Sequence, residues 1–328
     1  MRYLGRKAAF YLVAVWAALS LNFLLPRMMP GNPVDVIIAR TQNTTPLPPE
    51  ARHALELQFG IGGKSLWHQY LDYIGGLAHL DFGLSITYFP TPVSTVVAQA
   101  LPWTVALVGV ATAISFTLGI GLGALAGWRR GSWLDAVIPS ATFLAAVPYF
   151  WLALVLLYLL GNIWPVFPLA GGYDDTVASP GWSGAFIGTA VYHGVLPALT
   201  IVLSSVAGWM LGMRNMMVST MYEDYVLTAE AKGLRPRRVM LAYAARNAVL
   251  PSVSGFAISL GFVVAGSVVT EAVFSYPGVG FALLQAVQNA DYPLMQALFL
   301  VITLTVLGAN FLVDLLYTVI DPRTRHGG

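Results

Sequence analysis

The sequence predicts an all-α integral membrane protein with six transmembrane helices. Of its 328 residues, 57% are hydrophobic and only 10% are charged, whereas soluble globular proteins have about 45–50% apolar and about 25% charged residues. Several windows of about 20 residues, the length that crosses a bilayer core, contain almost no charged side chain. These windows are apolar on all sides, which is typical of membrane helices and not of amphipathic surface helices.

The same composition excludes several classes of protein. Too few charged residues are present to cover a water-exposed surface, which excludes a soluble enzyme and a disordered chain. A nucleic-acid-binding protein whose affinity comes from Lys and Arg is excluded for the same reason. The chain has no cysteine, which excludes disulfides and cysteine-ligated metal centres. We expect no catalytic residue, no metal site and no nucleic-acid partner.

The six apolar windows follow one another in a regular order. They comprise residues 8–26, 101–128, 136–161, 194–213, 250–270 and 294–319. Only Asp314 interrupts the last window. The first window could instead be a cleaved signal peptide. It is longer than the usual apolar stretch of about 7–15 residues, however, and no small-x-small cleavage site follows it.

The distribution of basic residues predicts the orientation of the chain. Six spans put both termini on one side of the membrane. If that side is the cytoplasm, only Arg27, Arg40, Arg52 and Lys64 of the 17 Lys and Arg residues lie outside, which satisfies the excess of positive charge in cytoplasmic loops. The chain then divides into a first segment with one span (1–27), an extracytoplasmic segment (28–98), a core of five spans (99–320) and a cytoplasmic tail (321–328).

The extracytoplasmic segment is expected to contain short helices at the outer membrane surface. Residues 49–59 and 65–79 have helical periodicity, and apolar side chains recur through the second range at near-helical spacing. Two interpretations remain open. The segment could be a structural cap over the spans, or it could be a docking surface for an external partner.

The cytoplasmic segment between the fourth and fifth spans, residues 215–249, has the pattern of two short helices joined by a glycine. One face of the first helix carries Tyr222, Tyr225, Val226 and Ala229. Gly233 stands where a helix C-cap falls, and Pro236 begins a second helix that is rich in arginine. Such a projection could lie in the hydrophobic groove of a partner, or it could rest on anionic lipid.

Parts of this cytoplasmic segment resemble a known family. Residues 224–234, with the sequence DYVLTAEAKGL, and residues 246–251, RNAVLP, look like the cytoplasmic coupling loop of ABC importer permeases. The version here is similar to that of the dipeptide/oligopeptide/nickel permease family. The general importer motif has its acid at the position of Leu227, whereas this chain has Glu230. The shifted position of the acid is similar to that in the peptide branch of the family. It leaves open which side chain makes a charged contact with the ATPase.

Further motifs of the same family occur in the same order along nearly the whole chain. They are PGNP at 30–33, LDFGLS at 80–85, LPWT at 101–104, FSYPGVG at 274–280, DYP at 291–293 and a spaced Asn–Asp–Tyr–Asp-Pro-Arg pattern across 310–323. Three positions depart from the family pattern: Asn32 replaces an acid, Leu80 a glycine and Phe82 a leucine. Each motif alone is weak, but their order between the expected spans is a strong resemblance.

The resemblance implies a permease subunit with a type I ABC importer fold in the bacterial plasma (inner) membrane. It implies a second homologous permease subunit, two ATPase subunits (or a homodimer), an extracytoplasmic solute-binding protein and the lipid bilayer as partners. ATP and Mg²⁺ would be bound by the ATPase subunits, so this chain needs no cofactor and is not itself an enzyme. The family's substrates include di- and oligopeptides, which we favour, and also nickel, glutathione and other small solutes.

A stand-alone secondary transporter is the alternative function. Such a transporter needs ion-coupling residues in several spans and often shows inverted repeats. The spans here contain little beyond Glu271 and Asp314 that could serve, and the two halves show no clear repeat.

Two groups of candidate site residues follow. Contact with the ATPase is expected from Tyr222, Tyr225, Val226, Ala229, Glu230 and Gly233. Polar groups at membrane depth are functional candidates, because lipid exposure costs about 2.5–3.5 kcal/mol. On this basis the pore or gate candidates are Glu271, Tyr276, Pro277, Asn310 and Asp314. A structural ion pair or N–H contact is favoured over a substrate amine for Glu271, and Asn310 and Asp314 are expected to lock a helix near the inner mouth.

Two patterns predict how the spans pack. Gly119, Gly123 and Gly127 recur at every fourth position of the second span, which predicts close packing against another span. Pro139 and Pro148 predict a kink in the third span.

Overall fold

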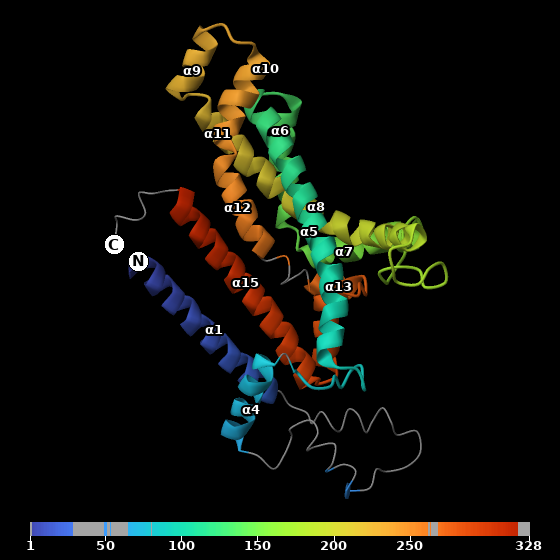
Figure 1. The fold of residues 1–328 in the computed structure, drawn as a ribbon. Helices are drawn as coiled ribbons and strands as arrows, with labels where there is room; N and C mark the ends of the chain where they lie inside the picture. Colours follow the sequence, from blue (N-terminus) through green and yellow to red (C-terminus); the bar gives the residue numbers. More distant parts are fainter. Residues whose placement is uncertain are drawn as a thin grey trace. The chain divides into compact units, whose positions relative to one another are not determined.

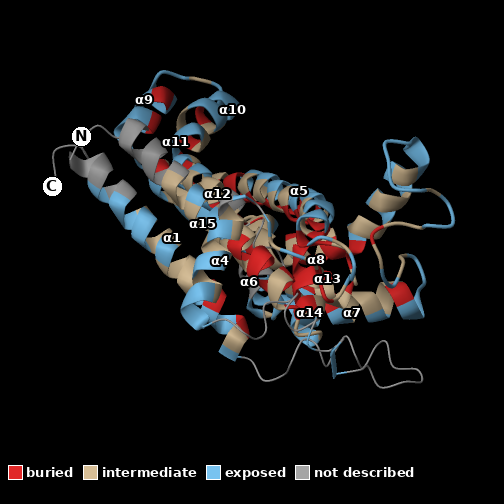
Figure 2. Cartoon of the chain, turned by 60° about the horizontal axis from the view of Figure 1, so that its bottom comes forward, coloured by how far each residue is buried: buried red, intermediate tan, exposed pale blue. Residues whose placement is uncertain are grey.

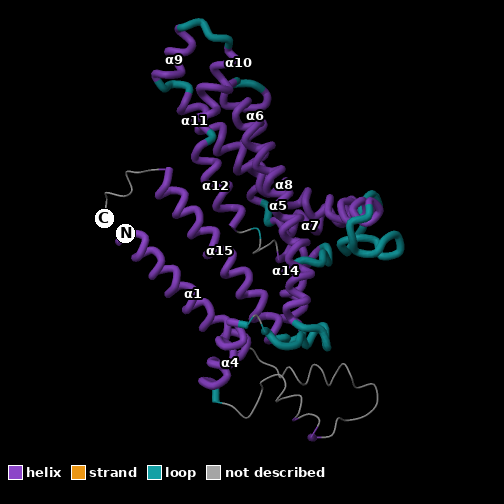
Figure 3. The backbone as a smooth tube through the Cα atoms, viewed as in Figure 1, coloured by secondary structure: helices purple, strands orange, loops and turns teal. Residues whose placement is uncertain are grey.

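The computed structural model describes residues 2–28, 49–50, 53, 65–79, 81–261, 263 and 268–320, and these residues confirm the all-α prediction. Within them helices are joined by loops and turns, without a strand (Figure 3). The helices are α1 (Arg2–Met28), α4 (Leu66–Ala78), α5 (Val93–Trp128), α6 (Trp133–Ala146), α7 (Tyr149–Leu157), the π-helix η1 (Tyr158–Ile163), α8 (Gly184–Thr220), α9 (Asp224–Ala231), α10 (Pro236–Arg238), the π-helix η2 (Val239–Ala245), α11 (Arg246–Ala248), α12 (Leu250–Gly261), α13 (Val268–Val273), α14 (Val279–Gln288) and α15 (Tyr292–Ile320).

Four helices are long and apolar enough to cross a membrane: α1 over Ala9–Met28, all of α5, all of α8, and α15 over Tyr292–Phe311. They correspond to the first, second, fourth and sixth predicted windows. The third window is divided between α6 and α7, which meet at Pro148, because proline disfavours helical backbone at the residue before it. The fifth window is divided between α12 and α13, and residues 262 and 264–267 between them lie outside the described part of the chain.

The chain folds as two compact units. The first comprises residues 1–104, 264–268 and 277–328. In this unit α1 packs along α15 (Figure 1). Its core joins the start of α5 to α14 and α15 through buried apolar side chains, among them Val93, Val279, Leu294 and Leu298.

Helix α4 is anchored on α1 within the first unit. Tyr70 and Ser20 share a hydrogen bond of 2.9 Å between their hydroxyls, and Arg27 donates from Nε to Gln69 Oε1 at 3.2 Å. The prediction of a helix over 65–79 is therefore confirmed, with Ser65 at its N-cap accepting from the His68 amide. The helix predicted over 49–59, the PGNP motif and the tail at 321–328 lie mainly or wholly outside the described residues.

The second unit comprises residues 105–263 and 269–276, and within it α5 approaches α8 closely. A Cβ atom added at Gly123 would lie 2.9 Å from the Cβ of Met213, and one added at Gly127 would lie 2.6 Å from the Cβ of Met217. Only a helix face without side chains permits such an approach. The prediction that the glycines of the second span pack against another span is therefore confirmed, and that span is α8.

Candidate functional site

The segment between α8 and α12 has the predicted form of a helix, a glycine turn and a second helix. Asp224 lies in the first turn of α9, where its negative charge is favourable to the helix dipole. The helix ends before Gly233, whose φ of 70° lies in the left-handed region that favours glycine. The Gly233 amide donates to the Glu230 carbonyl at 2.8 Å. Pro236 then begins α10, at the first helical position as predicted.

The inner face of α9 packs against the chain itself. Val226 is 0% exposed and Ala229 is 2% exposed. Both belong to a buried cluster that extends into α8, η2 and α11, which we call the knob core: Ala124, Met213, Met217, Val226, Ala229, Val239, Ala244 and Ala248. Helix α9 is therefore one wall of a packed unit, and two of the six predicted coupling residues are covered by this chain.

The remaining predicted residues are exposed, and of these Tyr225 and Glu230 lie on α9, whereas Tyr222 precedes the helix and Gly233 follows it. Tyr222 is 68% exposed and Tyr225 is 40% exposed, and Glu230 and Gly233 are exposed as well. Leu227, which the sequence pattern did not select, is 47% exposed. Figure 2 shows both the buried and the exposed side of this helix. Tyr225 and Leu227 are exposed apolar side chains that flank the buried residues of α9, and we call these two side chains together the outer face.

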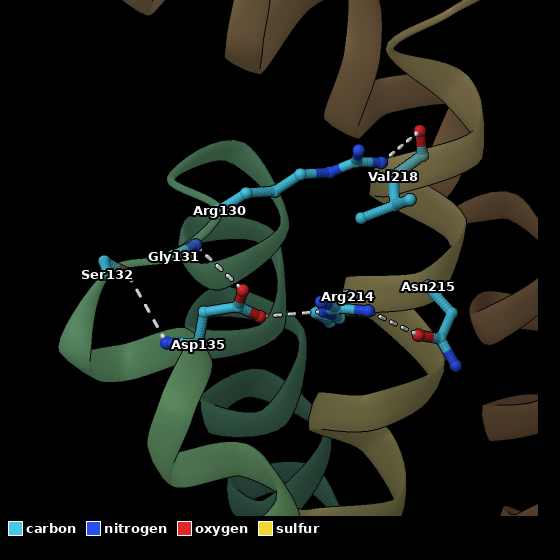
Figure 4. Close-up of polar contacts among 7 residues, drawn as sticks. All are labelled: Arg130, Gly131, Ser132, Asp135, Arg214, Asn215 and Val218. Atoms are coloured by element: carbon cyan, nitrogen blue, oxygen red, sulfur yellow. Dashed lines mark hydrogen bonds and ion pairs between the residues drawn. The ribbon is translucent and has the colours of Figure 1, made fainter.

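Two arginines connect the loop between α5 and α6 and the first turn of α6 to α8 (Figure 4). Arg130 donates to the Tyr222 hydroxyl at 2.8 Å and to the Val218 carbonyl at 3.2 Å. Arg214 of α8 forms an ion pair with Asp135 of α6, with 2.9 Å between Nε and Oδ1. No sequence pattern pointed to this cluster. The only signal was that the pair Arg129-Arg130 and the single Arg214 follow two apolar windows.

The electrostatics of this cluster favour a charged carboxylate on Asp135. The hydrogen bond from Arg214 holds the pKa of this carboxyl below its usual value, and a second hydrogen bond from the Gly131 amide, at 3.0 Å, acts in the same direction. Ser132 accepts from the Asp135 amide at 3.4 Å and so caps the start of α6. Asp135 is therefore fixed by three neighbours in the first turn of α6.

The gate candidates lie in different places. Glu271 in α13 is 0% exposed, and its carbonyl accepts from the Tyr276 amide at 2.8 Å. Tyr276 is buried and Pro277 is half-buried. The loop after η1 joins this region, since the Gly171 amide donates to the Phe274 carbonyl at 3.0 Å. Asn310 is half-buried on α15, whereas the side chain of Asp314 lies outside the described part of the structure.

Four of the motifs form two pairs within the first unit. Ser85 of the LDFGLS motif donates to Asp291 of the DYP motif at 2.5 Å, and both side chains are buried. Thr104 of the LPWT motif accepts from the Val279 amide of the FSYPGVG motif at 2.8 Å. Positions that are distant in sequence thus belong to two local hydrogen-bonded sites.

Comparison with known proteins supplies the family. Residues 119–326 match the family described as the binding-protein-dependent transport system inner membrane component. The chain belongs to this family. This inner membrane component is 33% identical to the di/tripeptide transport system permease protein of Pseudomonas aeruginosa strain UCBPP-PA14, over 99% of both chains.

Two other relatives are similar over most of their length. The dipeptide transport system permease protein of Escherichia coli K12 is 35% identical over 93% of both chains. The oligopeptide transport system permease protein of Bacillus subtilis 168 is 29% identical over 99% of both chains. The protein is therefore a multi-pass permease component of an inner membrane ABC transporter, and it functions in a complex with other subunits.

Proposed function

We propose that this permease component forms half of the translocation pathway of an ATP-driven importer for di- or oligopeptides delivered by a solute-binding protein. The observation that carries the substrate class is the identity of 33% and 35%, over more than nine-tenths of the chain, with permeases named for di/tripeptide and dipeptide transport. Nickel, glutathione or another small solute is the second candidate. Much of the selection among solutes would be made by the binding protein.

The proposed topology has six spans with both termini in the cytoplasm. Four helices of sufficient length support it, and the divided third and fifth windows would supply two further crossings. The orientation is supported by the exposed arginines of the coupling segment, Arg235, Arg237 and Arg238, which would be cytoplasmic. In this topology α9 and the loop between α5 and α6 lie on the same, cytoplasmic side.

The proposed energy source lies in other subunits. Two ATPase subunits, or a homodimer, would bind ATP and Mg²⁺, while this chain would bind neither and would catalyse no reaction. The outer face of α9 would lie in a groove of one ATPase subunit, as amphipathic helices do in apolar grooves. A second homologous permease would complete the pathway, and no nucleic acid would take part. The exposure of Tyr225 and Leu227 beside the buried knob core supports this contact.

An uptake assay tests the substrate class. Cells that lack the chain are complemented with it, and uptake of a radiolabelled dipeptide, a labelled pentapeptide, ⁶³Ni²⁺ and labelled glutathione is compared. The proposal expects uptake of the dipeptide or the pentapeptide to depend on the chain. Dependence of nickel or glutathione uptake alone would contradict the peptide assignment.

Co-purification tests the ATPase contact. Leu227→Arg and Tyr225→Arg place a charge on the outer face of α9, and we expect either change to reduce recovery of the ATPase with the tagged permease. Asp175→Arg, in the exposed loop before α8, is the control and should retain the ATPase. Ala229→Arg is unsuitable, because it would place a charge in the knob core. Unchanged ATPase recovery with both outer-face variants would contradict the contact.

A further inference from the structure

We propose that the loop between α5 and α6, together with the first turn of α6, is a second coupling element, in which Arg130 and Asp135 are positioning residues that make α6 move together with α9. This inference rests on the proposed function, because it describes how a displacement of α9 by the ATPase would spread through the permease. The two residues touch neither ATP nor solute. They act through Tyr222 and Arg214.

Arg130 connects the loop directly to the segment that leads into α9. Its guanidinium donates to the Tyr222 hydroxyl at 2.8 Å and lies 5.1 Å from the centre of the Tyr222 ring. Its other terminal nitrogen donates to the Val218 carbonyl of α8 at 3.2 Å. Tyr222 is two residues before α9. One planar side chain therefore holds the end of α8 and the turn that precedes α9 at the same time.

Asp135 connects the start of α6 to α8 by a second path. One carboxylate oxygen accepts from Arg214 at 2.9 Å, while the other accepts from the Gly131 amide at 3.0 Å. The two side chains are 31% and 13% exposed, so solvent screens this pair less than a fully exposed pair. The same two helices also pack through apolar side chains, since Ile138 of α6 and Met210 of α8 belong to one buried cluster.

These contacts give α9 a connection to α6 that the knob core does not provide. The knob core joins α9 to α8, η2 and α11, and also to Ala124 of α5, but it contains no residue of α6. Apolar packing already joins α6 to α8, and Arg130 and Asp135 add hydrogen bonds that hold the start of α6 and the loop before it to α8 and to Tyr222. With them, a shift of α9 is accompanied by α6 and by α7, which follows it in the chain and also packs on α8.

A coupling assay tests the proposal on the assembled transporter in proteoliposomes, with ATP hydrolysis and uptake of the transported peptide measured together. Arg130→Gln and Asp135→Asn are each expected to raise the ATP hydrolysed per peptide imported by about fivefold or more, the lower range of measured coupling effects. Arg129→Gln is the matched control, because this neighbour carries the same charge, is exposed, and shows no side-chain hydrogen bond within the described residues. Its ratio should equal that of the native complex.

Rescue distinguishes positioning from a general structural role. The double variant Asp135→Arg with Arg214→Asp restores an ion pair of opposite direction, and it should recover most of the coupling that Asp135→Asn loses. Tyr222→Phe removes only the hydroxyl that Arg130 holds, so it remains informative if Arg130→Gln assembles poorly. If the native complex imports peptide and the variants hydrolyse the same amount of ATP per peptide as it does, the inference is overturned. An inactive native complex would instead contradict the proposed function.

A distance measurement tests the common movement directly. The chain has no cysteine, so spin labels can be placed at the exposed Trp133→Cys at the start of α6 and Thr228→Cys on α9. In the assembled transporter we expect the distance between the labels to be equal without nucleotide and with trapped ATP, and to change with ATP when Arg130→Gln is added. A distance that changes with ATP to the same extent with and without Arg130 would overturn the proposal.

Discussion

Ser85 Oγ donates a hydrogen bond of 2.5 Å to Asp291 Oδ2, although the two residues are 206 positions apart in the sequence. The same oxygen accepts from the Thr87 amide at 2.8 Å, and the other oxygen accepts from the Leu294 amide at 3.1 Å. Asp291 thus caps the beginning of α15 and also fixes the loop that precedes α5. Its carboxylate is a structural centre of the first unit.

Replacing this carboxylate should destabilise the first unit. Asp291→Ala leaves a buried hydroxyl and two amides without their acceptor, and we expect a loss of about 1.5–3 kcal/mol from the free energy of unfolding. Asp291→Asn keeps one acceptor oxygen and should lose less. Thermal unfolding of the purified permease measures the effect, with the exposed Asp175→Asn as control. A melting temperature unchanged by Asp291→Ala would contradict this role.

Loss of the hydrogen bond between Thr104 and Val279 should also destabilise the first unit. Here the control variant changes the same residue. Thr104→Val preserves shape but leaves the buried Val279 amide without the hydroxyl that accepts its hydrogen bond. The expected cost is about 1–3 kcal/mol. Thr104→Ser retains the acceptor, so its stability should stay closer to that of the native chain. Equal melting temperatures for the valine and serine variants would show that the hydrogen bond contributes little.

Glycine-to-alanine substitutions on the two faces of α5 should change the free energy of unfolding in opposite directions. Gly123→Ala places a Cβ 2.9 Å from the Met213 Cβ and 3.1 Å from the Arg214 amide nitrogen. Such overpacking costs about 1–3 kcal/mol. Gly121→Ala meets nothing within 4 Å, and it should stabilise the helix by about 0.5–1 kcal/mol. Chemical unfolding of the two variants compares them. Similar effects of the two substitutions would mean that α5 and α8 are not in close contact at Gly123.

The ion pair of Asp135 predicts a dependence of stability on pH. Since the pKa of Asp135 is lowered in the folded state, its contribution to stability is present above the ordinary carboxyl value of about 3.9 and is lost as the pH falls below it. The melting temperature of Asp135→Asn should therefore be below that of the native protein at neutral pH, and the difference should close in acid. A difference that stays constant down to pH values below about 3 would contradict the ion pair's role.

The sequence predicted the parts of this protein that depend on local pattern. The glycine spacing of α5 identified a close contact, because the absence of side chains on one helix face has few other uses in a membrane. Gly233 and Pro236 correctly marked the turn between α9 and α10, because each fixes backbone geometry by itself. The division of the third window at Pro148 follows from the same local rule.

Other features depend on contacts between distant segments, which one sequence does not display. The apolar pattern placed Val226 and Ala229 on one face of α9, but it could not tell whether a partner or the chain's own η2 covers that face. The pairing of Asp135 with Arg214 joins the beginning of one helix to the end of another, and nothing local marks the two as partners. Ser85 and Asp291 were noticed only as members of separate motifs.

The most direct test of the central claim is cross-linking from the outer face of α9 in the assembled transporter. The chain is free of cysteine, so Leu227→Cys can carry a short photoreactive maleimide, with Val177→Cys in the exposed loop before α8 as control. The account predicts an adduct between Leu227→Cys and an ATPase subunit, and none from Val177→Cys. An ATPase-containing complex in which Leu227→Cys yields no such adduct, and is labelled by a small maleimide as fast as in the isolated permease, would contradict it.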